Sequence, residues 1–167
     1  MNSTMSDPTD LRIAQSVKEF AEVGRRYCEW AEGSALEPNE DMLAARCLLA
    51  ELHIAAINLP ENSPDTDDAE DRTFPEQWHA VCRRFSNLPV RGYWDVFDPL
   101  QDEKPVFNTL WDDLTDTYQD IKEGLLLFDD GKIEEAIWEW RFHFQIHWGA
   151  HLTGAQRAIH SYFNQLE

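Results

Sequence analysis

Basic residues are scarce in this sequence. Its 167 residues include 14 Lys and Arg against 32 Asp and Glu, which gives a formal net charge of −18. A surface of this charge is repelled by phosphate backbones and by anionic lipids. We therefore expect neither a nucleic-acid partner nor a membrane partner. Such acidity commonly serves solubility, and it can also steer a basic protein partner toward the surface.

Cysteine is equally sparse. Cys28, Cys47 and Cys82 lie far apart and form no Cys-x-x-Cys pair. An odd, scattered set argues against a disulfide framework and favours buried thiols in a reducing compartment. The first ten residues contain neither a basic nor an apolar targeting region, and no apolar run is long enough to span a bilayer. We therefore expect a cytoplasmic protein.

The signatures of several enzyme classes are also missing. The sequence has no Gly-x-Ser-x-Gly elbow, no Gly-Lys-Ser/Thr phosphate loop and no His-Glu-x-x-His zinc motif. These absences argue against a hydrolase triad and against nucleotide chemistry. They leave open whether the protein is an enzyme.

Apolar residues recur at the three- and four-residue steps that are typical of helices. This spacing, together with the Pro and Gly residues that mark helix ends, predicts helices over residues 7–33, 39–58, 75–87, 108–130 and 132–166. The last helix is expected to bend at Gly149 or Gly154. A short turn at Gly131 makes the last two helices an antiparallel hairpin. With no strand predicted, the expected fold is all-α: a single-domain bundle of about five helices over residues 1–167.

Two segments between these helices differ in composition. Residues 60–73 are rich in acids and contain no large apolar residue, which is typical of a solvated acidic loop. Residues 88–107 are aromatic and contain three prolines: Pro89, Pro99 and Pro105. Because proline interrupts helices, this second segment is expected to be extended or turning.

The second segment is also a candidate binding loop. Its aromatic and acidic residues are Tyr93, Trp94, Asp95, Phe97 and Asp98. Aromatic rings beside carboxylates can line a pocket for a cationic group. Alternatively, the rings pack on the helices while the aspartates cap turns. The sequence leaves both possibilities open.

From residue 92 onward the chain contains several distinctive motifs, most of them rich in aromatic residues. Its motifs are Gly92-Tyr93-Trp94-Asp95-Val96-Phe97-Asp98-Pro99, Asp112-Asp113-Leu114, Gly124-Leu125, Trp138-Glu139-Trp140-Arg141-Phe142 and His147-Trp148-Gly149-Ala150-His151. Together they resemble a bacterial family, the domain of unknown function 5063. The resemblance covers mainly residues 92–160, since the earlier part matches only in helical character. It implies a small bacterial helical protein and brings no catalytic residues with it.

Three histidines of the last predicted helix form the first half of a candidate site. His143, His147 and His151 follow Glu139 at four-residue steps, so neighbouring turns stack their side chains. The helical period places His151 within the apolar stripe, His147 at its border and His143 farther toward solvent.

Three aspartates of the preceding helix, Asp113, Asp116 and Asp120, share one flank and form the second half. In an antiparallel hairpin, residues at about equal sequence distances from the turn, here at Gly131, lie side by side. This reflection about the turn brings Asp113 within reach of His147. The same reflection brings Asp116 near His143 or His147, and Asp120 near Arg141 or His143.

Imidazoles and carboxylates in a bundle can bind a divalent transition metal. The candidate ligands are Asp113, Asp116, His143 and His147. The alternative is a structural network in which the carboxylates satisfy half-buried imidazoles, with no cofactor.

The sequence thus favours a protein-binding or assembly module. Its acidity and the lack of a catalytic signature both support this interpretation. The alternative function is a metal-binding protein or metal-dependent enzyme that uses the Asp/His cluster, with hydrolysis as its reaction.

Overall fold

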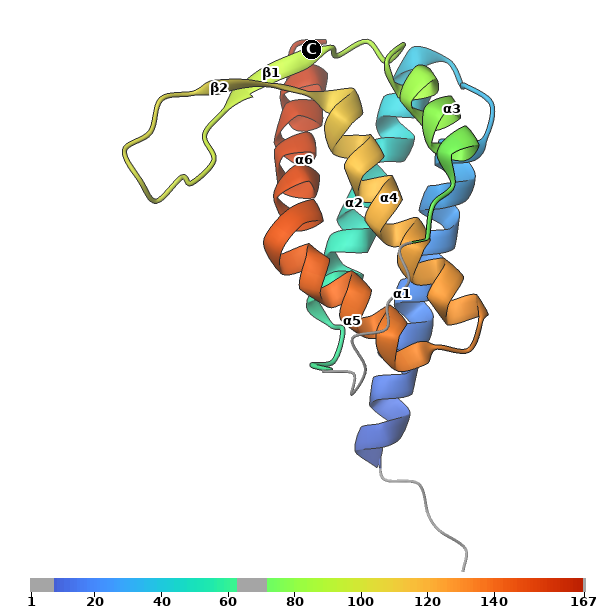
Figure 1. Cartoon of the computed structure of the whole chain (residues 1–167). Coiled ribbons are helices and arrows are strands. Elements are labelled where there is room, and N and C mark those ends of the chain that lie inside the picture. Colours follow the sequence, from blue (N-terminus) through green and yellow to red (C-terminus); the bar gives the residue numbers. More distant parts are fainter. Residues whose placement is uncertain (1–7, 63–71, 167) are drawn as a thin grey trace, which may run out of the picture.

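The computed structural model of the chain describes residues 8–62 and 72–166, with side chains from residue 15 onward. Its helices are α1 (Pro8–Glu32), α2 (Pro38–Ile57), α3 (Pro75–Phe85), α4 (Leu110–Asp129), α5 (Ile133–His143) and α6 (Gly149–Asn164). Helices α5 and α6 belong to one continuous rod, which we call the last rod. The described residues therefore form five helical rods (Figure 1). The predicted all-α bundle is therefore confirmed. Residues 63–71 of the predicted acidic loop lie outside the described residues.

Proline and glycine mark several helix ends. Pro38 and Pro75 stand in the first turns of α2 and α3, where a missing N–H removes no helical hydrogen bond. Gly131, between α4 and α5, has a φ of 78°, a conformation that favours glycine. The turn at Gly131 joins two antiparallel neighbours, as predicted. Among the described residues, no helix combines the length and apolar character needed to cross a bilayer.

Aromatic rings pack the first helix against the last rod. Phe20 of α1 packs against Trp140 and Trp148, with ring centroids 4.6 and 6.1 Å apart, and all three rings are fully buried. The indole N–H of Trp140 donates to the Ile121 carbonyl at 3.1 Å, and that of Trp148 donates to the Trp140 carbonyl at 3.0 Å. Both rings therefore bury a large apolar area without leaving a buried donor unsatisfied.

Two short strands lie within residues 92–109, so the expectation that the chain has none was wrong. β1 (Gly92–Asp95) pairs antiparallel with β2 (Val106–Thr109). With the connecting residues 96–105 they form a hairpin arm that extends away from the helices (Figure 1). Pro99 and Pro105 lie in the connection, outside the paired strands, where they interrupt no ladder hydrogen bond. The backbone over residues 88–107 is extended or turning and contains no helix.

The last rod changes its helical winding midway. Residues Phe144–Trp148 form a π-helix, η1, between α5 and α6. A methyl group on Gly149 would lie 2.2 Å from the Phe144 carbonyl oxygen, so only glycine admits this close approach. The bend predicted near Gly149 is therefore a π-turn. Figure 1 shows α5 crossing the lower end of α4 obliquely before the rod turns upward as α6.

Gly124 allows α4 to approach the last rod closely, because an added methyl would lie 2.1 Å from Trp140 Nε1. We expect Gly124→Ala to lower the free energy of unfolding by about 2 kcal/mol, since overpacking outweighs the better helix propensity of alanine. Gly24→Ala is the matched control, because its methyl meets only side-chain atoms of Ile121 and Leu125, at 3.0 Å or more. Urea denaturation measures both variants. An unchanged Gly124→Ala variant would contradict the close contact.

Candidate metal centre

Two carboxylates of α4 accept hydrogen bonds from two imidazoles of the last rod. His151 Nδ1 lies 2.8 Å from Asp113 Oδ1, and His147 Nδ1 lies 2.6 Å from Asp120 Oδ2. Because an ionised carboxylate only accepts, Nδ1 is the donor in each pair. In a neutral imidazole the lone pair then resides on Nε2.

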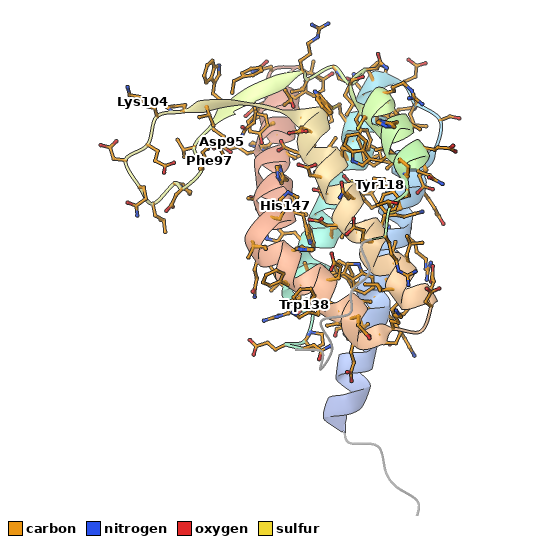
Figure 2. The ribbon with its side chains drawn as sticks, viewed as in Figure 1. Asp95, Phe97, Lys104, Tyr118, Trp138 and His147 are labelled. Atoms are coloured by element: carbon orange, nitrogen blue, oxygen red, sulfur yellow. The ribbon has the colours of Figure 1, made fainter. Side chains whose placement is uncertain are left out.

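Both Nε2 atoms face the same aspartate. Asp116 Oδ2 lies 3.4 Å from His151 Nε2 and 3.9 Å from His147 Nε2. One potential ligand atom from each of these three residues lies within 4.8 Å of the other two. Figure 2 shows His147 between α4 and the last rod. The three side chains therefore have the arrangement of a two-histidine, one-carboxylate metal site.

Burial dominates the electrostatics of the α4 flank. It raises the pKa values of Asp113, Asp116 and Asp120, and the facing imidazoles oppose the increase. The hydrogen bond to Asp113 raises the pKa of His151. Crowded, half-desolvated carboxylates favour a cation among them. That cation can be a proton on an imidazole or a metal ion.

The structure brings together two of the four predicted ligands, Asp116 and His147, and adds His151 to them. Asp113 instead accepts the hydrogen bond from His151 Nδ1, the ring nitrogen opposite the one that faces Asp116. His143 is directed elsewhere, since its Nδ1 atom lies 2.5 Å from Glu139 Oε1. The four-residue spacing of the histidines was the signal for His151. His151 lies within the predicted apolar stripe and was not among the predicted ligands.

The predicted pairings differ from the structure by about one helical turn. Asp113 pairs with His151 and not with His147, while Asp120 pairs with His147 and not with Arg141 or His143. The oblique path of α5 and the wider π-turn both bring later residues to the level of a given α4 residue. Of the two partners expected for Asp116, His147 is at 3.9 Å.

The predicted order of exposure is also wrong. The side chain of His147 is 44% exposed, whereas those of His143 and His151 are each 27% exposed. The π-turn rotates His147 outward relative to a uniform α-helix.

A cleft of about 450 Å³ adjoins the histidines and unites the two predicted sites. Its lining includes Asp113, His147 and His151 from the helices, and Tyr93, Asp95 and Phe97 from the hairpin arm. In Figure 2, Asp95 and Phe97 lie where the arm leaves the bundle.

Tyr93 connects the arm to the histidines. Its hydroxyl donates to Asp113 Oδ2 at 2.7 Å. A methyl on Gly154 would lie 2.3 Å from this hydroxyl, so the glycine leaves the space through which Tyr93 reaches Asp113. Tyr93, Asp113 and His151 therefore form a continuous hydrogen-bonded chain from the arm to the site.

Trp94 and Asp98 do not line the cleft. Trp94 is 67% exposed and meets the edge of Phe107 across the two strands, with centroids 5.5 Å apart. Asp98 Oδ1 accepts the Leu100 N–H at 2.9 Å, which caps a turn of the arm. The candidate loop thus divides between the two interpretations: three of its five residues line a cavity, and one caps a turn.

Sequence comparison places this architecture in a family. A family model described as domain of unknown function, DUF5063, matches residues 12–165. The chain belongs to the DUF5063 family. This match includes α2 and all but the first four residues of α1, which the resemblance over residues 92–160 did not cover.

A solved structure shows the same fold as this DUF5063 chain. The crystal structure of protein BF1032 from Bacteroides fragilis superposes with a TM-score of 0.76 at 21% sequence identity, covering 89% of this chain and 92% of that chain. No curated protein matches the sequence.

A further acidic group of the DUF5063 chain lies on α4, two turns beyond Asp116. Burial raises the pKa of Glu123 on α4 to about 7, and the neighbouring charges of Glu139 and Asp120 add to the increase. Glu139 is itself buried, and His143 faces it. The seam between α4 and the last rod therefore continues as a row of carboxylates and imidazoles.

Replacing Glu123 tests the burial of this row. Because the folded-state pKa of about 7 exceeds the ordinary value of 4.5, the contribution of Glu123 to wild-type stability falls as the pH rises from that ordinary value through the folded-state pKa. Glu123→Gln removes this loss. We expect it to stabilise the protein at pH 8 by about 1 kcal/mol, a figure reduced for partial exposure, and by little at pH 5.

Urea denaturation at both pH values measures the effect. Glu134→Gln, which removes an exposed carboxylate from α5, is the control. An equal effect of Glu123→Gln at pH 5 and pH 8 would show that Glu123 ionises normally.

Proposed function

We propose that this chain binds a divalent transition metal through Asp116, His147 and His151. The observation that supports the proposal is the convergence of two Nε2 atoms on one carboxylate oxygen, at 3.4 and 3.9 Å. Both opposite Nδ1 atoms are held by carboxylates, those of Asp113 and Asp120. A carboxylate on the far nitrogen is the usual partner of a metal-bound histidine, because it fixes the tautomer and the ring orientation.

A purely structural network explains less well why Nε2 of each ring lies next to Asp116. A neutral imidazole carries one N–H, which the Nδ1 hydrogen bond uses. Its Nε2 lone pair then faces an acidic oxygen, which is repulsive without a cation between them. A protonated imidazole would relieve this repulsion, and it is the alternative that a metal-binding measurement must separate from the proposal.

The composition and exposure of the site indicate which metal and which chemistry it suits. Two imidazoles and one carboxylate suit zinc, manganese or iron better than calcium or magnesium. Three protein ligands leave open coordination positions, as in catalytic sites. These positions adjoin the cleft, so water activated by the metal could attack a bound molecule, and hydrolysis is the enzymatic reaction we propose.

Metal binding to untagged protein tests the proposal. We expect about one bound zinc, manganese or iron(II) ion per chain by elemental analysis, since three converging ligands form a single site. Titration calorimetry of His147→Ala and His151→Ala should show binding lost, because each variant removes one of only three ligands. Absence of binding in the wild type would refute the proposal.

Two histidines outside the site serve as controls. His143→Ala should bind metal as the wild type does, although the sequence had made His143 a candidate ligand. His160→Ala removes an exposed histidine whose Nε2 lies 3.1 Å from the Asn164 amide, and it should also bind normally. Loss of binding in either control would contradict the ligand set.

Asp120→Asn is expected to weaken binding roughly 10- to 100-fold without changing its stoichiometry, because it acts through His147. The wild-type affinity should also fall as the pH is lowered through the raised pKa of His151, since the metal must displace that proton.

The predicted protein-binding role is independent of this centre. A basic protein partner, predicted from the net charge of −18, stays a prediction. An assembly role is supported by a different surface, the outer face of α2.

A further inference from the structure

Helix α2 is apolar on its outer face as well as on its core face. Leu43, Ile54 and Ile57 are 52%, 64% and 63% exposed, and Cys47 and Ala50 are exposed between them. We call these five residues the α2 stripe. Isolated exposed apolar residues are ordinary, but a continuous row along a helix marks an interaction surface.

The spacing of the α2 stripe is that of a two-helix seam. Its members follow one another at steps of four, three, four and three residues, which are the d and a positions of successive heptads. A seam of this period matches a second helix lying alongside, because knobs from one helix enter holes in the other. Ala50 at its centre allows the two backbones to approach closely.

The flanking charges indicate what that second helix is. In this heptad register Arg46 occupies a g position and Glu51 an e position. In a parallel pair, a g residue lies beside the e residue five positions later in the partner helix. In such a pair Arg46 would meet Glu51 of the partner subunit, and the same contact would recur across the two-fold axis.

In an antiparallel pair, g positions instead flank g positions and e positions flank e positions, so Arg46 and Glu51 of the two copies would lie on opposite sides of the seam and could not pair. Within its own chain, Glu51 already pairs with Arg26, yet its side chain remains 44% exposed. It can accept a second cation from a partner. The helix thus complements a parallel copy of itself.

We propose that two copies of this chain associate through the α2 stripe as a parallel, two-fold pair. The inference is independent of the metal centre, which lies on α4 and the last rod. Two helices bury less area than a standard interface, so the dissociation constant is expected to be on the order of 10 μM. The two-fold axis places Cys47 of each chain next to Cys47 of the partner subunit.

Sedimentation velocity over a range of protein concentrations tests the association. The expected result is a monomer–dimer equilibrium for the wild type and a monomer for Ile54→Lys at every concentration. Because Ile54 is exposed, Ile54→Lys should retain the wild-type melting temperature, which circular dichroism checks. A wild type that remains monomeric, or an Ile54→Lys variant that still dimerises, would overturn the proposal.

Oxidation of Cys47 tests the parallel register. Diamide, a two-electron oxidant, takes up the two thiol hydrogens as a disulfide forms between the sulfur atoms. A covalent dimer is expected for the wild type and not for Cys47→Ser. Ile54→Lys keeps Cys47 and should also fail to crosslink, which excludes random collision.

The other two thiols give an internal check. Cys28 is buried and Cys82 half-buried, so neither is expected to crosslink. In an antiparallel pair centred on Ala50, Cys47 would lie opposite His53 of the partner subunit. A dimer without a Cys47 disulfide would therefore contradict the parallel arrangement.

Discussion

The interaction on which the rest of the structure depends is the pairing of buried α4 carboxylates with imidazoles of the last rod. Asp113 and Asp120 are 4% and 5% exposed, so their charges lose most of their hydration. A buried, unpartnered carboxylate is strongly destabilising. His151 and His147 supply the missing partners, which makes one relative position of the two helices more favourable than its neighbours.

The π-turn and the hairpin arm are both arranged around this pairing. The π-turn carries His147 to the level of Asp120, and Gly149 admits the carbonyl that the turn brings close. Tyr93 of the arm reaches Asp113 across Gly154 and closes one side of the cleft. Local irregularities of this kind are often associated with functional sites. Here they place exposed imidazole nitrogens, an acidic oxygen and a cavity together.

The helices were predictable because each obeys a local rule. Pro38, Pro75 and Gly131 interrupt the apolar period close to where the helices begin and end. The strands were not predictable, because four-residue segments show too little alternation to separate them from an extended loop. The residue types of the site were visible as well, since the Asp and His rows lie on facing helices.

The relative register of those rows was not predictable. It depends on the crossing angle of α5 and on one turn of altered winding, which arise from packing over the whole rod. The reflection about Gly131 therefore matched Asp113 with His147 one turn too early. His151 illustrates a second limit, because a position in an apolar stripe does not prevent a half-buried side chain from facing a polar site.

The tautomers of His147 and His151 test the central claim most directly. Two-bond nitrogen–proton correlation spectra, recorded at a pH where both rings are neutral, report which ring nitrogen carries the proton. The pairing predicts that both neutral rings are protonated at Nδ1, with Nε2 free toward Asp116. Protonation at Nε2 in either ring would mean that it is not held by its α4 carboxylate, and this would contradict the account.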